Sequence, residues 1–159
     1  MIRFTCALLP LLALSGHASA QVNPQFADVN DDIEMVRSLV RVERKAVIEQ
    51  GMELSPAESQ AFWPIYAEYE TERTAINDRK VKLITDYAAA YPDLSDDLAK
   101  SLLADLFEVE SDTVDLRQKY ARRLGKVLAA TRVARFIQLE SKLDAVVNLS
   151  LAEQIPLAL

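Results

Sequence analysis

The chain has one cysteine and one histidine, Cys6 and His17, and both fall within its first twenty residues. Those residues, MIRFTCALLPLLALSGHASA, combine a basic start, an apolar run and the pattern Ala18-Ser19-Ala20 that a signal peptidase cleaves. We therefore expect residues 1–20 to be a signal peptide that is removed. The remaining chain would then hold no disulfide, no thiol nucleophile, no imidazole base, and no zinc or copper site built on those groups.

Long apolar runs are also missing. The run from Phe4 to Leu14 is shorter than the roughly 20 residues that cross a bilayer, and no later run approaches that length. The formal net charge of −6 becomes about −7 once Arg3 is removed, which disfavours nucleic-acid binding. Gly51 and Gly125 are the only glycines after the signal peptide, too few for a phosphate-binding loop or a turn-rich β protein. We expect an exported protein with no membrane span and no nucleic-acid partner.

The residues after the expected cleavage site show no helical period. Residues 21–30, QVNPQFADVN, contain a proline and predict a loose N-terminal arm before a single domain of residues 31–159. The spacing then changes, and a helix is predicted over 31–50, with Gly51 at the position of a C-terminal cap. The predicted apolar face of this helix comprises Ile33, Val36, Val40 and Val47.

The opposite side of this predicted helix carries Arg37, Arg41 and Arg44 at helical spacing, with few acidic residues between them. Two interpretations of these arginines stay open. They form either a solvated face that pairs with carboxylates elsewhere in the chain, or a basic surface that binds a protein partner.

The segment from Leu54 to Glu58 has the pattern of a helix start. The Ser55 hydroxyl can accept a hydrogen bond from the Glu58 amide, while the Glu58 side chain returns to the Ser55 amide. Pro56 falls at the first helical position, where its missing N–H costs nothing. A helix is therefore predicted over 55–90. Its apolar stripe recurs every seven residues and comprises Phe62, Tyr69, Ile76 and Leu83.

Trp63 and Pro64 lie inside this predicted helix. A proline there removes one backbone hydrogen bond and clashes with the preceding turn, at a cost of about 3 kcal/mol in a regular helix. We therefore predict a bend over 60–64, with Phe62 and Tyr66 packed on its inside. Trp63 projects about 100° around the helix from Phe62, so it either covers the neighbouring helix or lies at an interface, where tryptophan is enriched. The predicted bend and a candidate interface are thus marked by four residues: Phe62, Trp63, Pro64 and Tyr66.

Two further helices complete the predicted fold. The proline after Tyr91 ends the second helix, Ser95 starts a third over 95–128, and a fourth is predicted over 131–147. The apolar tail that follows should pack back onto the others. The two long helices would each run about 50 Å, so we predict an all-α fold: an elongated antiparallel helical hairpin with two shorter flanking helices. The modest buried surface of such a shape favours a homodimer.

The acidic residues are the remaining candidates for chemistry. Asp105, Glu108, Asp112 and Asp115 lie along one side of the predicted third helix. They form either a solvated, ion-paired surface or a site for a hard cation such as calcium, although a straight helix spreads its carboxylates along its axis. No pair of acids suits general acid–base work, because no second type of group separates their roles. We therefore expect no catalytic residue, no metal site, no cofactor and no enzyme activity.

The start of the second helix carries a family resemblance. With Leu54 and Ser55 opening a long helix in an exported, helical chain, the sequence resembles the LTxxQ proteins, the Spy/CpxP-like family of periplasmic helical proteins. Glu58 stands where the family motif has its glutamine, and Gln60 follows two residues later. The resemblance covers most of residues 33–147 as architecture and only this short stretch as motif.

This resemblance implies a dimeric helical cradle in the periplasm. Members of the family act as ATP-independent chaperones that shield unfolded clients, or as accessory inhibitors and sensors in envelope-stress and metal-stress signalling. The leading hypothesis is a non-enzymatic periplasmic binding protein, a Spy/CpxP-like chaperone or envelope-stress accessory protein that binds a protein partner or unfolded client as a homodimer. The alternative is a structural or interaction subunit of a larger envelope assembly.

Overall fold

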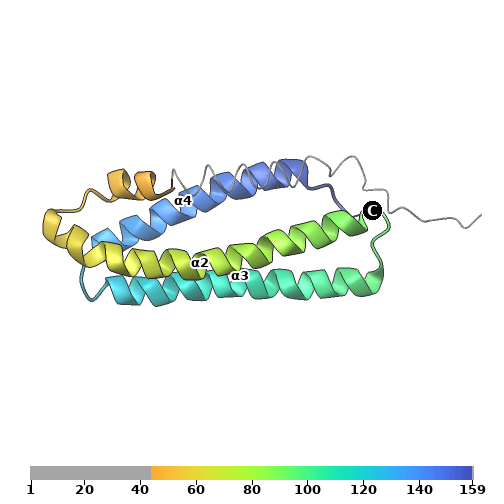
Figure 1. Ribbon diagram of the computed structural model, residues 1–159, viewed down its shortest axis with the longest axis horizontal. Helices are drawn as coiled ribbons and strands as arrows, with labels where there is room; N and C mark the ends of the chain where they lie inside the picture. The colour runs from red at the N-terminus through yellow and green to blue at the C-terminus, as the bar shows by residue number, and fades with distance from the viewer. Residues whose placement is uncertain (1–43, 159) are drawn as a thin grey trace, which may run out of the picture.

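The computed structural model of the protein describes residues 44–158. In this part of the chain a short helical segment, residues 44–52, is followed by three long helices. These are α2 (Pro56–Ala90), α3 (Asp96–Leu124) and α4 (Ala130–Gln154), and together they form an extended bundle (Figure 1). The described residues contain no strand, which confirms the all-α prediction.

Part of the predicted organisation lies outside the described residues. The signal peptide (1–20), the arm (21–30) and most of the helix predicted over 31–50 belong to this part, as do Arg37 and Arg41. The last residues of that predicted helix are described, and they are helical.

Helices α2 and α3 lie side by side and run in opposite directions (Figure 1). Two ion pairs mark their register: Glu68 lies 2.8 Å from Arg123, and Arg79 pairs with Asp112. As the residue number rises along α2, the residue number of its ion-pair partner on α3 falls, as it does for antiparallel helices. Each of these pairs is exposed or half-buried, so each contributes only about 0.2–1 kcal/mol. They specify the alignment of the two helices more than they stabilise it.

Helix α4 runs in the same direction as α2 and packs against both other helices. Near its start, Phe136 meets Phe62 edge to face, with ring centroids 5.7 Å apart. Further along, the Lys80 ammonium donates a hydrogen bond to the Asn148 side chain at 2.5 Å. Contacts between α2 and α4 thus extend over most of the length of α4.

The C-terminal tail packs back onto α2, as predicted. Leu151 and Ile155 contact the buried side chain of Ile84. The Tyr87 hydroxyl donates a hydrogen bond of 2.9 Å to the backbone carbonyl of Pro156. The apolar sequence of the tail is explained by this burial.

The predicted helix starts are confirmed. At α2 the Glu58 amide donates to Ser55 Oγ at 3.3 Å, and the Ser55 amide donates to the Glu58 carboxylate at 2.9 Å. Pro56 occupies the first turn. At α3 the Leu98 amide donates to Ser95 Oγ at 3.3 Å. Each cap satisfies backbone N–H groups that have no partner inside the helix.

Two predicted helix ends are wrong. Helix α3 ends at Leu124 rather than at residue 128, because the next backbone bonds tighten into turns: the Lys126 N–H donates to the Arg123 carbonyl at 3.2 Å and the Val127 N–H to the Leu124 carbonyl at 3.0 Å. Helix α4 continues to Gln154 rather than ending at residue 147. The next proline stands only at residue 156, so nothing breaks the helix earlier.

Gly51 is also not the predicted cap. The helical segment continues through Met52, and Glu53 leaves it with a φ of 48°, in the left-handed region. A Cβ atom at Gly51 would lie 2.8 Å from the terminal methyls of Leu139. The glycine therefore allows the segment to approach α4 closely, and the Arg132 guanidinium donates to the Met52 carbonyl at 3.0 Å.

The core is unevenly distributed along the bundle. At the end of the bundle where α2 begins, ten buried side chains form one cluster, which we call the aromatic end. They are Ile48, Met52, Phe62, Tyr66, Tyr69, Leu116, Tyr120, Leu124, Leu128 and Phe136. At the opposite end, which we call the open end, Ile84 is the one buried hydrophobic of its cluster, and its neighbours are half-buried. The aromatic end therefore carries most of the described core.

Candidate functional site

The residues of the family-like motif form a structural cap. Leu54 packs against the aromatic end, while Ser55 and Pro56 are exposed. Hydrogen bonds from the backbone and side chain of Ser55 hold the pKa of Glu58 below its usual value. Because these polar groups already bond one another, they act in starting α2.

Phe62 and Tyr66, which were predicted to pack on the inside of the bend, belong to the core. Both are buried, and their rings stack with centroids 5.4 Å apart. Trp63 is half-buried beside them. The Lys45 ammonium lies 5.5 Å from the centroid of the Trp63 ring, in a cation–π contact. Trp63 thus covers the segment 44–52, one of its two predicted roles.

Pro64 lies exposed inside a continuous helix, because α2 extends unbroken from Pro56 to Ala90. Figure 1 shows the first turns of α2 inclined to the long remainder of the helix. The bend over 60–64 stays a prediction. Its test is whether the incline is lost in a Pro64→Ala variant.

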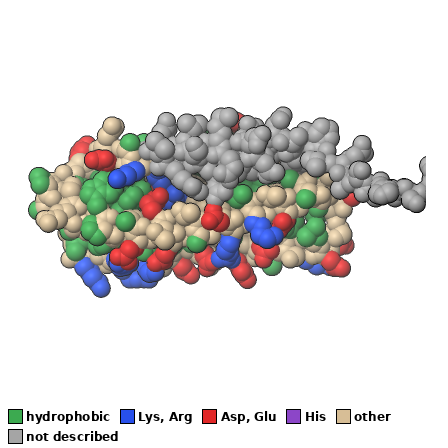
Figure 2. Space-filling view, in the orientation of Figure 1, with side chains coloured by type: hydrophobic (Ala, Val, Ile, Leu, Met, Phe, Trp, Pro, Cys, Tyr) green, Lys and Arg blue, Asp and Glu red, His purple; other side chains and the backbone are tan. Residues whose placement is uncertain are grey.

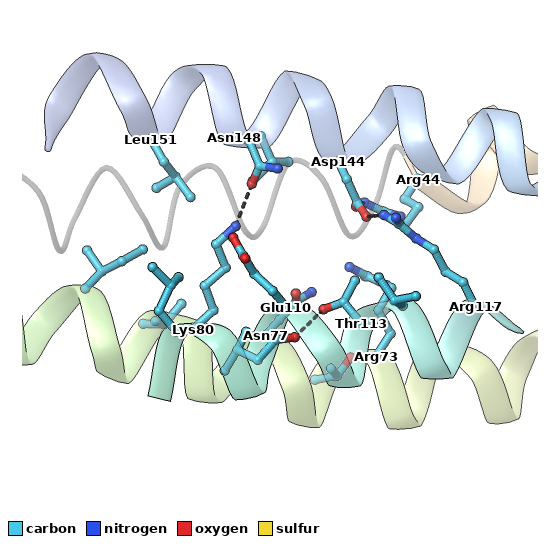
Figure 3. Close-up of a pocket in the computed structure, with 17 residues that line it drawn as sticks. Arg44, Arg73, Asn77, Lys80, Glu110, Thr113, Arg117, Asp144, Asn148 and Leu151 are labelled. Atoms are coloured by element: carbon cyan, nitrogen blue, oxygen red, sulfur yellow. Dashed lines mark hydrogen bonds and ion pairs between the residues drawn. The ribbon is translucent and has the colours of Figure 1, made fainter. Parts of the chain in front are cut away.

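Arg44 pairs with carboxylates elsewhere in the chain, as one of its two interpretations has it, but it is buried and so belongs neither to a solvated face nor to a basic partner surface. Its side chain is only 1% exposed. One terminal nitrogen lies 2.5 Å from Glu140 of α4. The other lies 2.6 Å from Asp144, also on α4 (Figure 3). A guanidinium this deeply buried needs carboxylate partners, because an unpaired charge in the core costs several kcal/mol. The buried face of the segment also includes Ile48, whereas Val47 is exposed.

A polar network centred on Glu140 crosses the core. Its carboxylate accepts hydrogen bonds from Arg44 and from the Tyr69 hydroxyl, at 2.5 and 2.8 Å. Burial raises the pKa of Glu140, and the charge of Arg44 together with the Tyr69 hydrogen bond opposes that rise. Asp144 extends the network by pairing with both Arg44 and Arg117. The segment 44–52, α2, α3 and α4 are thereby linked through charged groups.

In the sequence, Glu140 shares one helical face with the apolar residues Phe136 and Leu143. An acid between Phe136 and Leu143 on such a face is itself a signal of a buried ion pair, because a buried carboxylate requires a cation.

The hydrogen bonding of the network is also incomplete. Four buried polar atoms have no hydrogen-bond partner among the described residues: Arg44 Nε, Tyr66 Oη, Arg117 Nε and Glu140 Oε1.

A cavity of about 500 Å³ lies between α2, α3 and α4, beside this network (Figure 3). Its charged and polar wall is formed by Arg44, Arg73, Thr74, Asn77, Lys80, Glu110, Thr113, Arg117, Asp144 and Asn148. Its aliphatic wall includes Val81, Ile84, Leu106, Val147 and Leu151. The cavity therefore joins the end of the ion network to the open end of the bundle. Sequence periodicity alone did not indicate it.

An exposed apolar stripe runs along α3. Leu103, Phe107 and Val114 recur at helical spacing and are each at least half exposed. We call these three residues the α3 stripe. Figure 2 shows acidic and basic side chains interspersed along the side of the bundle that α3 forms. On α4, Val146 and Leu149 are also exposed.

Two of the four acidic residues singled out on α3, Glu108 and Asp112, form ion pairs at the surface. Arg79 of α2 pairs with Asp112 and lies 3.3 Å from Glu108. Among residues 44–158, no group of three or more acidic, histidine or cysteine side chains is placed to hold a metal ion. The solvated interpretation accounts for these two carboxylates.

Comparison of the chain with protein-family models, with curated proteins and with solved structures finds no match. Within the described part of the chain, no helix combines the length and apolarity needed to cross a membrane. The fold and the site together define an all-helical protein with a dense aromatic end, a cavity toward its open end, and an exposed apolar stripe on α3.

Proposed function

We propose that the protein is a non-enzymatic periplasmic binding protein of the Spy/CpxP-like kind, which shields unfolded client segments. In this proposal residues 1–20 direct export, and α2 with α3 forms the antiparallel hairpin of a homodimer. The resemblance around Leu54 and Ser55 and the signal-peptide pattern support the compartment. The α3 stripe supports the binding role.

The α3 stripe is the observation on which the proposal depends. Single exposed apolar residues are ordinary, but three on one face of one helix form an apolar line, which Glu110 interrupts between Phe107 and Val114. Phe107 at its centre is 63% exposed, and an aromatic ring supplies a large contact area. An unfolded client exposes apolar side chains of its own, and covering them against the stripe removes both surfaces from water.

Charged side chains beside the stripe favour transient binding. Lys100 and Glu110 are exposed on this side of α3, and Asp96 begins the helix. Charges around an apolar line keep the free protein soluble, because they oppose the collapse of one stripe onto another. The stripe can therefore stay exposed until a client arrives.

The proposal is tested by measuring aggregation of a chemically unfolded client by light scattering, with the purified chain of residues 21–159. We expect the unaltered chain to suppress client aggregation at a near-equal molar ratio of chain to client. The Phe107→Ser variant should lose this suppression. Leu149→Ser is the matched control, because Leu149 is 64% exposed and lies on α4. Both substitutions should change the free energy of unfolding by less than about 0.5 kcal/mol.

Two results would contradict the proposal. The first is an intact chain that leaves client aggregation unchanged. The second is crosslinking in whole cells that captures one fixed partner at constant stoichiometry, which is the expectation for a structural subunit of an envelope assembly.

A further inference from the structure

The cavity between α2, α3 and α4 has the size of a small-molecule site. Its volume of about 500 Å³ falls within the range of roughly 300–1,000 Å³ typical of ligand pockets. Its described walls come from the long helices and from Arg44, rather than from loops. Helical walls hold side chains in more fixed positions than loops do.

The chemistry of the wall changes along the cavity. Arg44, Arg73 and Arg117 lie toward the aromatic end, and Leu151 lies toward the open end (Figure 3). The distance along α2 from Arg73 to Ile84 is about 16 Å at 1.5 Å per residue. The cavity is therefore elongated, with charged side chains at one end and aliphatic side chains at the other.

Lys80 differs from the arginines of the cavity. Arg44 and Arg117 bond Asp144, and Arg73 bonds Glu70 at 2.7 Å. The Lys80 ammonium instead donates to the neutral side chain of Asn148.

Within residues 44–158, the Lys80 ammonium has no bonded counter-charge. Burial lowers the pKa of Lys80, while the more distant charges of Asp144 and Glu110 oppose this effect. Among the described residues, no carboxylate lies within ion-pairing distance of the Lys80 ammonium. It is thus a partly desolvated cation to which an external anion could bond.

We propose that this cavity binds an amphiphile with one carboxylate head and an unbranched aliphatic tail, the chemistry of a medium-chain fatty acid. The head accepts hydrogen bonds from the Lys80 ammonium and the Asn148 side-chain amide. The tail lies along Val81, Ile84 and Leu151, where it covers half-buried aliphatic surface. A charge-assisted hydrogen bond anchors the head, and apolar burial supplies the remaining affinity.

Isothermal titration calorimetry with dodecanoate, below its micellar concentration, tests the proposal on the chain of residues 21–159. We expect saturable binding of one dodecanoate per chain. Lys80→Gln should weaken it by about tenfold or more, the loss expected for one charge-assisted hydrogen bond. Lys82→Gln is the matched control and should leave affinity unchanged, because the Lys82 side chain is 74% exposed and pairs with Asp86.

Two further probes separate a built site from general apolar affinity. Dodecanol lacks the anionic head, and dodecyltrimethylammonium reverses its charge, so both should bind at least about tenfold more weakly than dodecanoate. Asn77→Phe places a large ring in the cavity wall and should abolish saturable binding, with helix content measured by circular dichroism unchanged.

Equal affinity for the three amphiphiles, equal affinity of Lys80→Gln and Lys82→Gln, or no saturable binding would each overturn the proposal. The inference does not rest on client shielding. Lys80→Gln should suppress client aggregation as well as the unaltered chain does, whereas Phe107→Ser should bind dodecanoate normally. Failure of one proposal is therefore distinguishable from failure of the other.

Discussion

The two ends of the bundle are built from the same helices but differ in how they are filled. At the aromatic end, Phe62, Tyr69, Tyr120 and Phe136 are fully or almost fully buried and meet edge to face. At the open end Ile84 is surrounded by half-buried side chains. Between the two ends lie the Glu140 network and the cavity.

This difference assigns stability to one end and binding to the other. A close-packed cluster gains both apolar burial and dispersion contacts, while an unfilled cavity forfeits them along its walls. Local stability should therefore fall along α2 and α4 from the aromatic end to the open end. A binding cavity tolerates that loss, because a ligand restores the missing contacts.

The largest expected effect is at the boundary between the ends. Glu140→Ala leaves the Arg44 guanidinium buried with only one carboxylate, Asp144, and leaves the Tyr69 hydroxyl unpaired. Loss of one partner of a buried ion pair costs about 3–5 kcal/mol. Urea denaturation followed by circular dichroism measures this change in the free energy of unfolding.

A double variant supplies the control for that prediction. Arg44→Met with Glu140→Leu removes both charges and keeps apolar volume, so most of the stability lost in Glu140→Ala should return. Equal destabilisation in the single and double variants would show that volume rather than charge pairing governs this position.

Truncation of one apolar side chain at each end compares the two clusters directly. Phe136→Ala should destabilise the protein by about 3–5 kcal/mol, because its ring contacts Phe62, Tyr66 and Tyr69. Ile84→Ala should cost about 2 kcal/mol, the lower limit for such truncations, because its half-buried neighbours can relax. If urea denaturation showed a larger loss of unfolding free energy for Ile84→Ala than for Phe136→Ala, the open end rather than the aromatic end would carry more of the stability.

The smallest expected effect concerns the helix caps. Ser55→Ala at the aromatic end removes the capping box with Glu58 and should cost about 1 kcal/mol. Ser95→Ala near the open end removes one hydrogen bond to the Leu98 amide and should cost about 0.5 kcal/mol. Thermal unfolding of the two variants side by side gives the comparison, and equal shifts would argue against a gradient in stability.

Local patterns predicted the parts of this fold that depend on neighbours in sequence. The Ser55–Glu58 cap spans four residues, and the stop at Tyr91-Pro92 spans two, so both were accessible from the sequence. The end of α4 was not, because residues 148–154 carry no clear helical period, and their helix depends on packing against Ile84.

The candidate site depends on contacts that no local pattern encodes. Arg44 and Glu140 are separated by 96 residues, and helical spacing alone left Arg44 either on a solvated face or on a basic partner surface. The prediction for Gly51 fails for the same reason, because its role is set by Leu139 on another helix. Periodicity indicates which residues share a face, whereas tertiary packing decides which face is buried.

Amide hydrogen exchange along α4 tests the division between the two ends most directly. Amides near Phe136 and Glu140 should exchange only through global unfolding. Their exchange rate should therefore fall steeply when the free energy of unfolding increases. Amides near Leu151 should exchange at least about tenfold faster through local opening. Uniform protection from Phe136 to Leu151 would contradict the account, because it would show that both ends unfold as one cooperative unit.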